Sequence, residues 1–68
     1  MDKLYRVVII DDDEFSADNL CLELKKYNRL SIDGMARNGV NGRKLLEKVH
    51  PDLLLLDVEL PDMKGMEL

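Results

Sequence analysis

Three aspartates in this sequence stand directly after apolar runs, where they could together bind a cation. Asp11 and Asp12 follow the run Tyr5–Ile10, and Asp57 follows the four consecutive leucines Leu53–Leu56. Two like charges about 4 Å apart repel by roughly 4 kcal/mol at an effective dielectric near 20. A cluster of the three is therefore tolerated only if a carboxyl pKa rises or a cation binds.

An acidic cluster of this kind favours a hard cation and phosphoryl chemistry. Ligand sets made of oxygen atoms, without His or Cys, suit Mg²⁺, Mn²⁺ or Ca²⁺. An open crevice with few protein ligands favours Mg²⁺, which keeps several waters and shares ligands with phosphate. A carboxylate beside the ion can attack a phosphoryl group and form an aspartyl phosphate. If a carboxyl pKa rises instead, the metal-free fold gains stability as the pH falls through that folded pKa.

The elements that must position these aspartates alternate between strand and helix. Tyr5–Ile10 is rich in β-branched residues and predicts a central parallel strand. A helix is expected over Glu14–Tyr27, with acids near its start and Lys25-Lys26 near its end, as the helix dipole prefers. One apolar stripe at helical spacing supports it, formed by Ala17, Leu20, Cys21 and Leu24.

The remaining chain continues the alternation. Leu30–Ala36 predicts an edge strand, and Asn41–Val49 predicts a helix with Asn38 or Asn41 as its N-cap. The strand is expected to present one side made of Leu30, Ile32, Gly34 and Ala36. The helix presents a stripe made of Gly42, Leu45, Leu46 and Val49, and it ends at His50 because Pro51 follows. A buried strand over 52–57, a loop over 58–65 and the start of a third helix at 66–68 complete the chain.

This order predicts an α/β fold: a flavodoxin-like, doubly wound parallel sheet, truncated after three strands and a helix stub. With right-handed crossovers and Leu30–Ala36 at an edge, the strand order is 2-1-3. The first and third strands are then neighbours whose carboxyl ends open on the same side, at the switch point where such sheets bind ligands. The topology therefore brings Asp11, Asp12 and Asp57 to one crevice.

Composition argues against several other classes of protein. A chain of 68 residues is one domain at most, and its net charge of −4 with scattered Lys and Arg argues against nucleic-acid binding through this segment. The longest apolar run, Leu53–Leu56, is too short to cross a membrane. One cysteine, Cys21, and no signal-peptide pattern indicate the cytoplasm. Cys21 lies on the apolar helical stripe, which predicts a packing role.

Two stretches together resemble the response-regulator receiver domain of two-component signalling. They are Val7–Glu14, an apolar strand ending in acids, and Pro51–Gly65, an apolar strand ending in Asp57 followed by a proline–glycine loop. The resemblance covers the whole chain, residues 1–68, as the N-terminal part of such a domain, and the second stretch is the more specific. It implies a phosphoacceptor rather than a turnover enzyme.

The resemblance also implies a role for each site residue. Asp57 would accept a phosphoryl group from the phosphohistidine of a sensor histidine kinase. Asp11, Asp12 and Asp57 would bind Mg²⁺, or Mn²⁺ in its place, and Glu59 would add its backbone carbonyl. Pro61 and Gly65 would shape the loop beside the site. Any output domain, such as one for transcription regulation, would lie outside these residues.

The chain departs from the family pattern in its extent. A full receiver domain has five strands, and the last two strands and helices have no counterpart in residues 1–68. The hydroxyl residue after the fourth strand and the lysine after the fifth are therefore missing. The resemblance implies that metal ligands are retained while phosphorylation and signalling are impaired.

Two alternative functions remain open at this point. Ile9–Phe15 also resembles the Asp-x-Asp motif of haloacid-dehalogenase-type phosphatases, with Asp11 as nucleophile and Asp13 as acid/base, although this leaves Asp57 without a role. For Asp13 and Glu14, a solvated helix start is the simpler interpretation. The other alternative is a non-phosphorylated dimerisation module. A bare edge on the all-leucine strand predicts a homo-oligomer, formed by edge pairing or by a domain swap.

Overall fold

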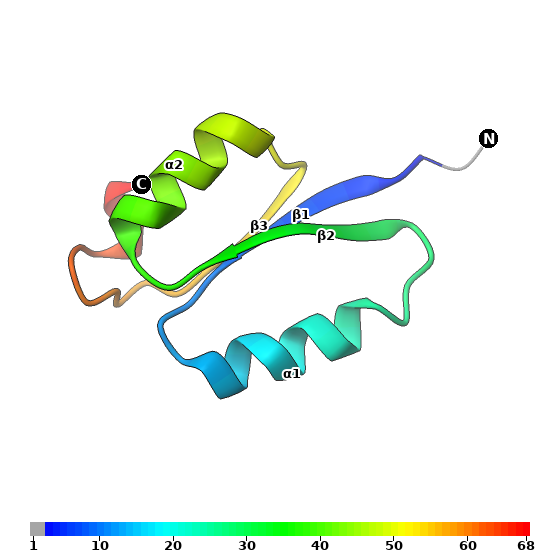
Figure 1. Cartoon of the computed structure of the whole chain (residues 1–68), viewed down its shortest axis with the longest axis horizontal. Helices are drawn as coiled ribbons and strands as arrows, with labels where there is room; N and C mark the ends of the chain where they lie inside the picture. The colour runs from blue at the N-terminus through cyan, green and yellow to red at the C-terminus, as the bar shows by residue number, and fades with distance from the viewer. Residues whose placement is uncertain (1–2) are drawn as a thin grey trace.

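The computed structural model describes residues 3–68, which form one parallel three-stranded sheet with a helix on each face (Figure 1). The elements in chain order are β1 (Tyr5–Ile10), α1 (Glu14–Leu24), β2 (Leu30–Ala36), α2 (Gly39–Val49), β3 (Leu53–Leu56) and the short 3₁₀ helix η1 (Gly65–Glu67). The strand order is β2-β1-β3, which confirms the predicted 2-1-3 order. No helix in the described part of the chain is long and apolar enough to cross a membrane.

The central strand β1 provides the core for both faces of the sheet. Its last four residues, Val7 to Ile10, are at most 1% exposed. Because side chains alternate along a strand, Val7 and Ile9 pack with Ala17 on the α1 face, while Val8 and Ile10 pack with Val49 on the α2 face. β1 therefore fixes the position of Asp11, the residue that follows Ile10, at the carboxyl end of the sheet.

Helix α1 begins where it was predicted and ends three residues early. The Asp13 side chain caps it by accepting hydrogen bonds from the amides of Phe15 and Ser16. The helix ends at Leu24 rather than Tyr27, because the chain tightens into turns in which Tyr27 N–H donates to the Leu24 carbonyl. Lys25 is the C-cap and Lys26 follows it, so both lie near the end of the helix as expected.

Strand β2 carries a bulge that contradicts one expectation. Val7 pairs with Ile32, but Val8 pairs with Gly34, so Asp33 is an extra residue. One extra residue switches the side of every residue after it. Leu30 and Ile32 pack on the α1 face, whereas Ala36 packs on the α2 face. The prediction that Leu30, Ile32, Gly34 and Ala36 share one side was wrong for this reason.

Helix α2 begins at Gly39, two residues before the predicted Asn41. Asn38, the first of the two predicted caps, accepts the Asn41 amide at 2.8 Å. The helix ends as predicted, with His50 in the left-handed conformation (φ 52°) directly before Pro51. Its stripe packs on the sheet, and a Cβ built on Gly42 would lie 2.7 Å from Ile10 Cδ1. Glycine at this position therefore allows the helix to approach β1 closely.

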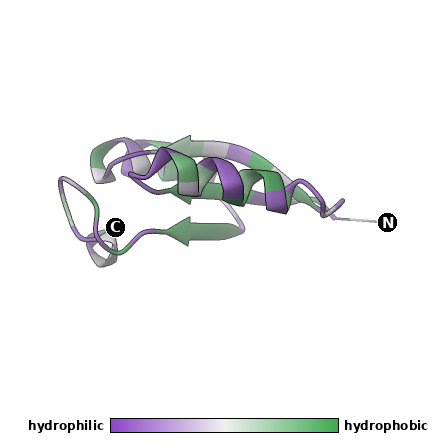
Figure 2. Cartoon of the chain, turned by 90° about the horizontal axis from the view of Figure 1, so that it is seen from below, coloured by the Kyte–Doolittle hydropathy of each residue, from purple (hydrophilic) through white to green (hydrophobic). Residues whose placement is uncertain are grey.

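Strand β3 forms the outer edge of the sheet and is only partly covered. The assigned strand is Leu53–Leu56, and the amides of Asp52 and Asp57 extend its ladder by donating to the Arg6 and Ile10 carbonyls. Both helices pack mainly over β1 and β2. Figure 2 shows the apolar outer strand lying clear of α1. Leu53 is 39% exposed and the other three leucines are partly buried.

Candidate functional site: an acidic cluster at the carboxyl ends of β1 and β3

The pairing of β1 with β3 determines where the three aspartates lie. The two strands are parallel and Ile10 pairs with Leu56. The next residue on each strand, Asp11 and Asp57, therefore leaves the sheet at the same level. The Asp57 amide donates to the Ile10 carbonyl at 2.9 Å, which fixes this level. The turn after Asp11 then brings Asp12 over the same end of the sheet.

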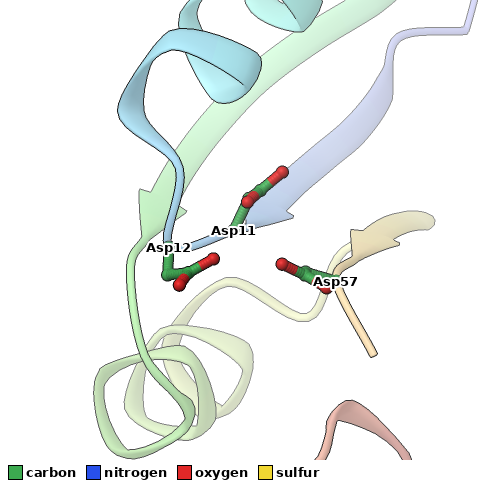
Figure 3. A group of neighbouring side chains, drawn as sticks. All are labelled: Asp11, Asp12 and Asp57. Atoms are coloured by element: carbon green, nitrogen blue, oxygen red, sulfur yellow. The ribbon is translucent and has the colours of Figure 1, made fainter. Parts of the chain in front are cut away.

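The structure brings all three carboxylates together, as the topology predicted. One carboxylate oxygen from each of Asp11, Asp12 and Asp57 lies within 4.8 Å of the other two. Figure 3 shows the carboxylates of Asp12 and Asp57 directed toward each other, with Asp11 beside them. They line an open crevice of about 610 Å³ that also contacts Ser16 and Leu20 of α1. Asp11 and Asp57 are partly buried, and Asp12 is exposed.

Backbone amides orient two of the three carboxylates. Asp11 Oδ1 accepts the Asp13 amide at 2.9 Å, and Asp57 Oδ1 accepts the Glu59 amide at 3.0 Å. Both are local contacts in which an aspartate accepts the amide two residues ahead. Each leaves the second oxygen of that carboxylate available to the crevice.

The electrostatics of the cluster fall most heavily on Asp12. Loss of contact with water, a hydrogen bond to Asp57 and the negative charges of Asp57 and Asp11 raise the pKa of the Asp12 carboxyl. Such a rise is the response expected of crowded carboxylates without a cation. A divalent cation placed among these oxygens would offset the negative charges that contribute to this rise in pKa.

Asp13 lies beside the cluster and has a different role. Its Oδ2 accepts the Ser16 hydroxyl at 2.9 Å, and its Oδ1 accepts the Phe15 amide at 3.0 Å. The Ser16 hydroxyl and these amides hold the pKa of the Asp13 carboxyl below its ordinary value. Asp13 is therefore a helix cap that stays ionised, which makes it a poor general acid for the phosphatase alternative.

Glu59 contributes its backbone to the site and keeps its carboxylate outside it. Among the described residues, the acidic cluster consists of Asp11, Asp12 and Asp57 only. Glu59 is exposed, its amide binds Asp57, and its backbone pairs with Lys64 in an isolated antiparallel bridge. Gly65 closes this loop at a point where a Cβ would lie 2.5 Å from the Asp57 carbonyl oxygen. The expectation that Gly65 shapes the loop has this physical basis.

Asp62 belongs to the surroundings of the site, and its sequence context did not indicate this. Its carboxylate accepts the amides of Gly39 and Val40, the first two residues of α2. These backbone hydrogen bonds hold the pKa of the Asp62 carboxyl below its ordinary value. The one sequence signal was an acid in a proline–glycine loop. Its partners are 22 and 23 residues away, so local pattern could not identify them.

Comparison with protein families identifies the chain. The family model described as the response regulator receiver domain matches residues 7–68, which include all three clustered aspartates. This chain belongs to the response regulator receiver domain family. The receiver domain assignment and its phosphoacceptor role were therefore predicted correctly, and the phosphatase and dimerisation-module alternatives are not favoured.

Two curated relatives show the proteins in which similar receiver domains are found. The transcriptional regulatory protein BtsR of Shigella flexneri is 32% identical over 65 residues, which are 96% of this chain and 27% of that protein. A protein-glutamate methylesterase/protein-glutamine glutaminase of Halalkalibacterium halodurans is 36% identical over 67 residues, 98% of this chain and 19% of that protein. This chain thus spans about a quarter or less of the length of these relatives.

A solved structure matches the receiver fold described above. The response regulator domain of Thermotoga maritima CheB superposes with a TM-score of 0.91 at 25% sequence identity. The match covers 96% of this chain and 48% of that one. The flavodoxin-like sheet expected from the sequence is therefore confirmed, and the chain spans about half of the solved domain.

Proposed function

We propose that Asp57 is the phosphoacceptor of this receiver domain and that a sensor histidine kinase is the donor. The observation that carries the proposal is the convergence of Asp11, Asp12 and Asp57 at the carboxyl ends of β1 and β3, in a chain of the receiver family. Asp57 is the member that ends a strand in the position the family motif gives to the acceptor. Its partial burial and the Glu59 amide hold its carboxylate toward the crevice.

The donor set of the crevice fits Mg²⁺, with Mn²⁺ as a substitute. Three carboxylates within 4.8 Å of one another provide the hard oxygen ligands that these ions prefer. We propose Asp11, Asp12, Asp57 and the backbone carbonyl of Glu59 as the ligands. When bound, the ion would supply positive charge against the oxygens of the phosphoryl group and the carboxylates.

The residues of the chain would act on the phosphoryl group as follows. The Glu59 amide holds Asp57 Oδ1 at 3.0 Å, so Oδ2 is the oxygen that attacks phosphorus. The new O–P bond forms as the N–P bond of the phosphohistidine breaks, and the electron pair of that bond returns to the imidazole. The negative charges of Asp11 and Asp12 oppose this approach unless a cation offsets them. Transfer should therefore depend on the divalent ion.

The chain matches only part of the solved receiver domain. Residues 1–68 match about half of the solved CheB receiver domain. We infer that they form the N-terminal part of a receiver domain. As one of the relatives is a transcriptional regulatory protein by name, we also propose a cytoplasmic role in transcription regulation, with no nucleic acid or membrane bound by this segment.

The test of the phosphoacceptor is intact-mass measurement after incubation with Mg²⁺ and a small acyl phosphate. We expect one phosphoryl group to add slowly, and Asp57→Asn to abolish the addition. Asp18→Asn, which removes an exposed acid on α1, should react as the unaltered chain does. Phosphorylation that persists in Asp57→Asn but is lost in Asp11→Asn would instead support the phosphatase-type nucleophile.

We also propose that copies of this chain associate through β3. The support is an outer strand of four leucines with one paired edge and incomplete cover from either helix. An unpaired apolar strand edge is a template for pairing with another chain. Exchange of a whole element between two copies would cover the same strand.

A further inference from the structure

The segment after β3 is held against α2 by a bidentate contact. Asp62 Oδ1 accepts the Gly39 amide at 2.6 Å and Oδ2 accepts the Val40 amide at 2.9 Å. The first four amides of a helix have no acceptor within the helix. The two bonds to Asp62 therefore give an acceptor to two of these amides. Gly39 and Val40 precede Asp62 by 23 and 22 residues in the sequence. The contact therefore fixes how a loop sits on a distant helix.

Other contacts place the same segment on α2. Met63 packs on Gly39, where a Cβ would overlap the Met63 side chain, so the absence of a side chain makes room for the loop. One turn further along, Arg43 donates to the Glu67 carbonyl at 3.2 Å. Figure 1 shows the C-terminal segment beside α2 along this stretch. Helix α2 is thus the surface on which the loop is positioned.

Backbone contacts cross the loop between Asp62 and the acidic cluster. Glu59 pairs with Lys64 across it, and the Leu60 amide donates to the Met63 carbonyl at 3.1 Å. These bonds enclose Asp62 at the tip of a short hairpin. At the open end of the hairpin, the Glu59 amide binds Asp57 Oδ1. A shift of the tip is therefore passed to the residue that orients Asp57.

We propose that Asp62 is a positioning residue for the cation site. By binding the first turn of α2 with both carboxylate oxygens, it fixes the loop that holds the Glu59 amide and carbonyl relative to Asp11, Asp12 and Asp57. Asp62 itself does not touch the cluster. The inference rests on the proposed function, because the site being positioned is the Mg²⁺ site.

The chain offers a matched control for this idea. Asn38 caps the same helix by accepting the Asn41 amide, and no contact of Asn38 with the 58–65 loop is among its hydrogen bonds in the described structure. If Asp62 only stabilised α2, Asp62→Ala and Asn38→Ala would behave alike. If Asp62 positions the loop, the first alone should weaken the cation site.

The experiment is calorimetric titration of the chain and its variants with Mg²⁺. We expect Asp62→Ala to weaken Mg²⁺ binding by about ten-fold or more, the usual effect of losing a group that orients metal ligands. Asn38→Ala should bind Mg²⁺ as the unaltered chain does. Asp62→Asn, which keeps one acceptor oxygen, should fall between them, and it decides the matter if Asp62→Ala does not fold. Equal weakening in Asp62→Ala and Asn38→Ala would overturn the proposal.

A second readout separates this inference from the proposed function. Without any metal, amide hydrogen exchange at Glu59 reports whether the loop is held. We expect the Glu59 amide to exchange faster in Asp62→Ala and at its normal rate in Asn38→Ala. If the unaltered chain binds no Mg²⁺, the proposed function fails while the exchange rates still test the loop. A Glu59 amide equally protected in Asp62→Ala would overturn the positioning role.

Discussion

Asp12 and Asp13 are adjacent in the sequence and both exposed, yet their carboxyl pKa values move in opposite directions. Asp12 loses contact with water and meets Asp57 and Asp11, so its negative charge is disfavoured and its pKa rises. Asp13 meets the Ser16 hydroxyl and backbone amides, so its negative charge is favoured and its pKa falls. The neighbours of each carboxylate thus separate the candidate metal ligand from the helix cap.

Removing the charge of Asp12 should make the metal-free chain more stable. A folded pKa above the unfolded value means that the ionised group opposes folding at pH 7, and that stability rises as the pH falls through the folded pKa. We expect Asp12→Asn to melt several degrees higher than the unaltered chain without metal, and to gain less from millimolar Mg²⁺. Thermal unfolding followed by circular dichroism, with and without Mg²⁺, measures both effects.

The control for this prediction is Asp18→Asn, which makes the same change in net charge on the exposed face of α1. It should leave the response to Mg²⁺ intact. An unaltered chain whose melting temperature does not change with Mg²⁺ would count against a formed site.

At the scale of elements, β1 and β2 have the bounds that the sequence predicted, and the other elements differ at their ends. The pattern of apolar residues identifies β1, because all of its last four residues are apolar and buried. It could not locate the end of α1, where turn-like hydrogen bonds continue to Tyr27. It could not show the bulge at Asp33 either, because a bulge depends on pairing with another strand.

The candidate site could also be predicted only in part. The topology alone brought Asp11, Asp12 and Asp57 to one end of the sheet, and the structure has them there. The role of Asp62 was not predictable, because it requires a loop to fold back onto a helix that precedes β3. Contacts between strand ends follow from sheet order, whereas contacts between a loop and a helix follow from packing.

The bulge residue of β2, Asp33, is acidic, and its replacement should change how the stability of the fold depends on pH. Asp33 accepts from Arg6 of β1 at 2.6 Å and from the Ser31 hydroxyl at 2.5 Å, and these bonds lower the pKa of its carboxyl. A lowered folded pKa contributes stability above the ordinary value of 3.8, and this stability is lost as the pH falls through the folded pKa. We expect Asp33→Asn to be less stable at pH 7 and to lose less stability on acidification.

Urea unfolding between pH 7 and pH 3 tests this expectation. Asp18→Asn serves as the comparison, because it also removes one acid and leaves the pairing of β1 with β2 intact. The expectation is wrong if Asp33→Asn and the unaltered chain show parallel losses of unfolding free energy as the pH falls.

At the scale of the whole molecule, the outer edge of β3 has no strand beside it among the described residues. Small chains bury a limited share of their surface, so an uncovered apolar strand matters more here than in a large domain. We expect the average mass in sedimentation equilibrium to rise with concentration. Leu53→Lys, which puts a charge on the exposed start of β3, should keep the chain monomeric, because charges on edge strands oppose pairing.

Leu22→Lys is the matched control, since Leu22 is 63% exposed on α1 and the substitution is the same. It should associate as the unaltered chain does. A mass equal to one chain at every concentration would contradict association through β3. Equal suppression by both lysine variants would point to a contact that is not specific to this strand.

Asp33, the extra residue in β2, also determines how a deletion in that strand would act. Deleting Asp33 would join Ile32 to Gly34 in regular pairing with β1, and every later residue would keep its partner and its face. Met35, 42% exposed, would stay opposite Ile9, and Ala36 would stay opposite Ile10 on the α2 face. Within β2, the pairing with β1 therefore decides which face each side chain meets, and the bulge allows the strand to hold one residue more than that pairing uses.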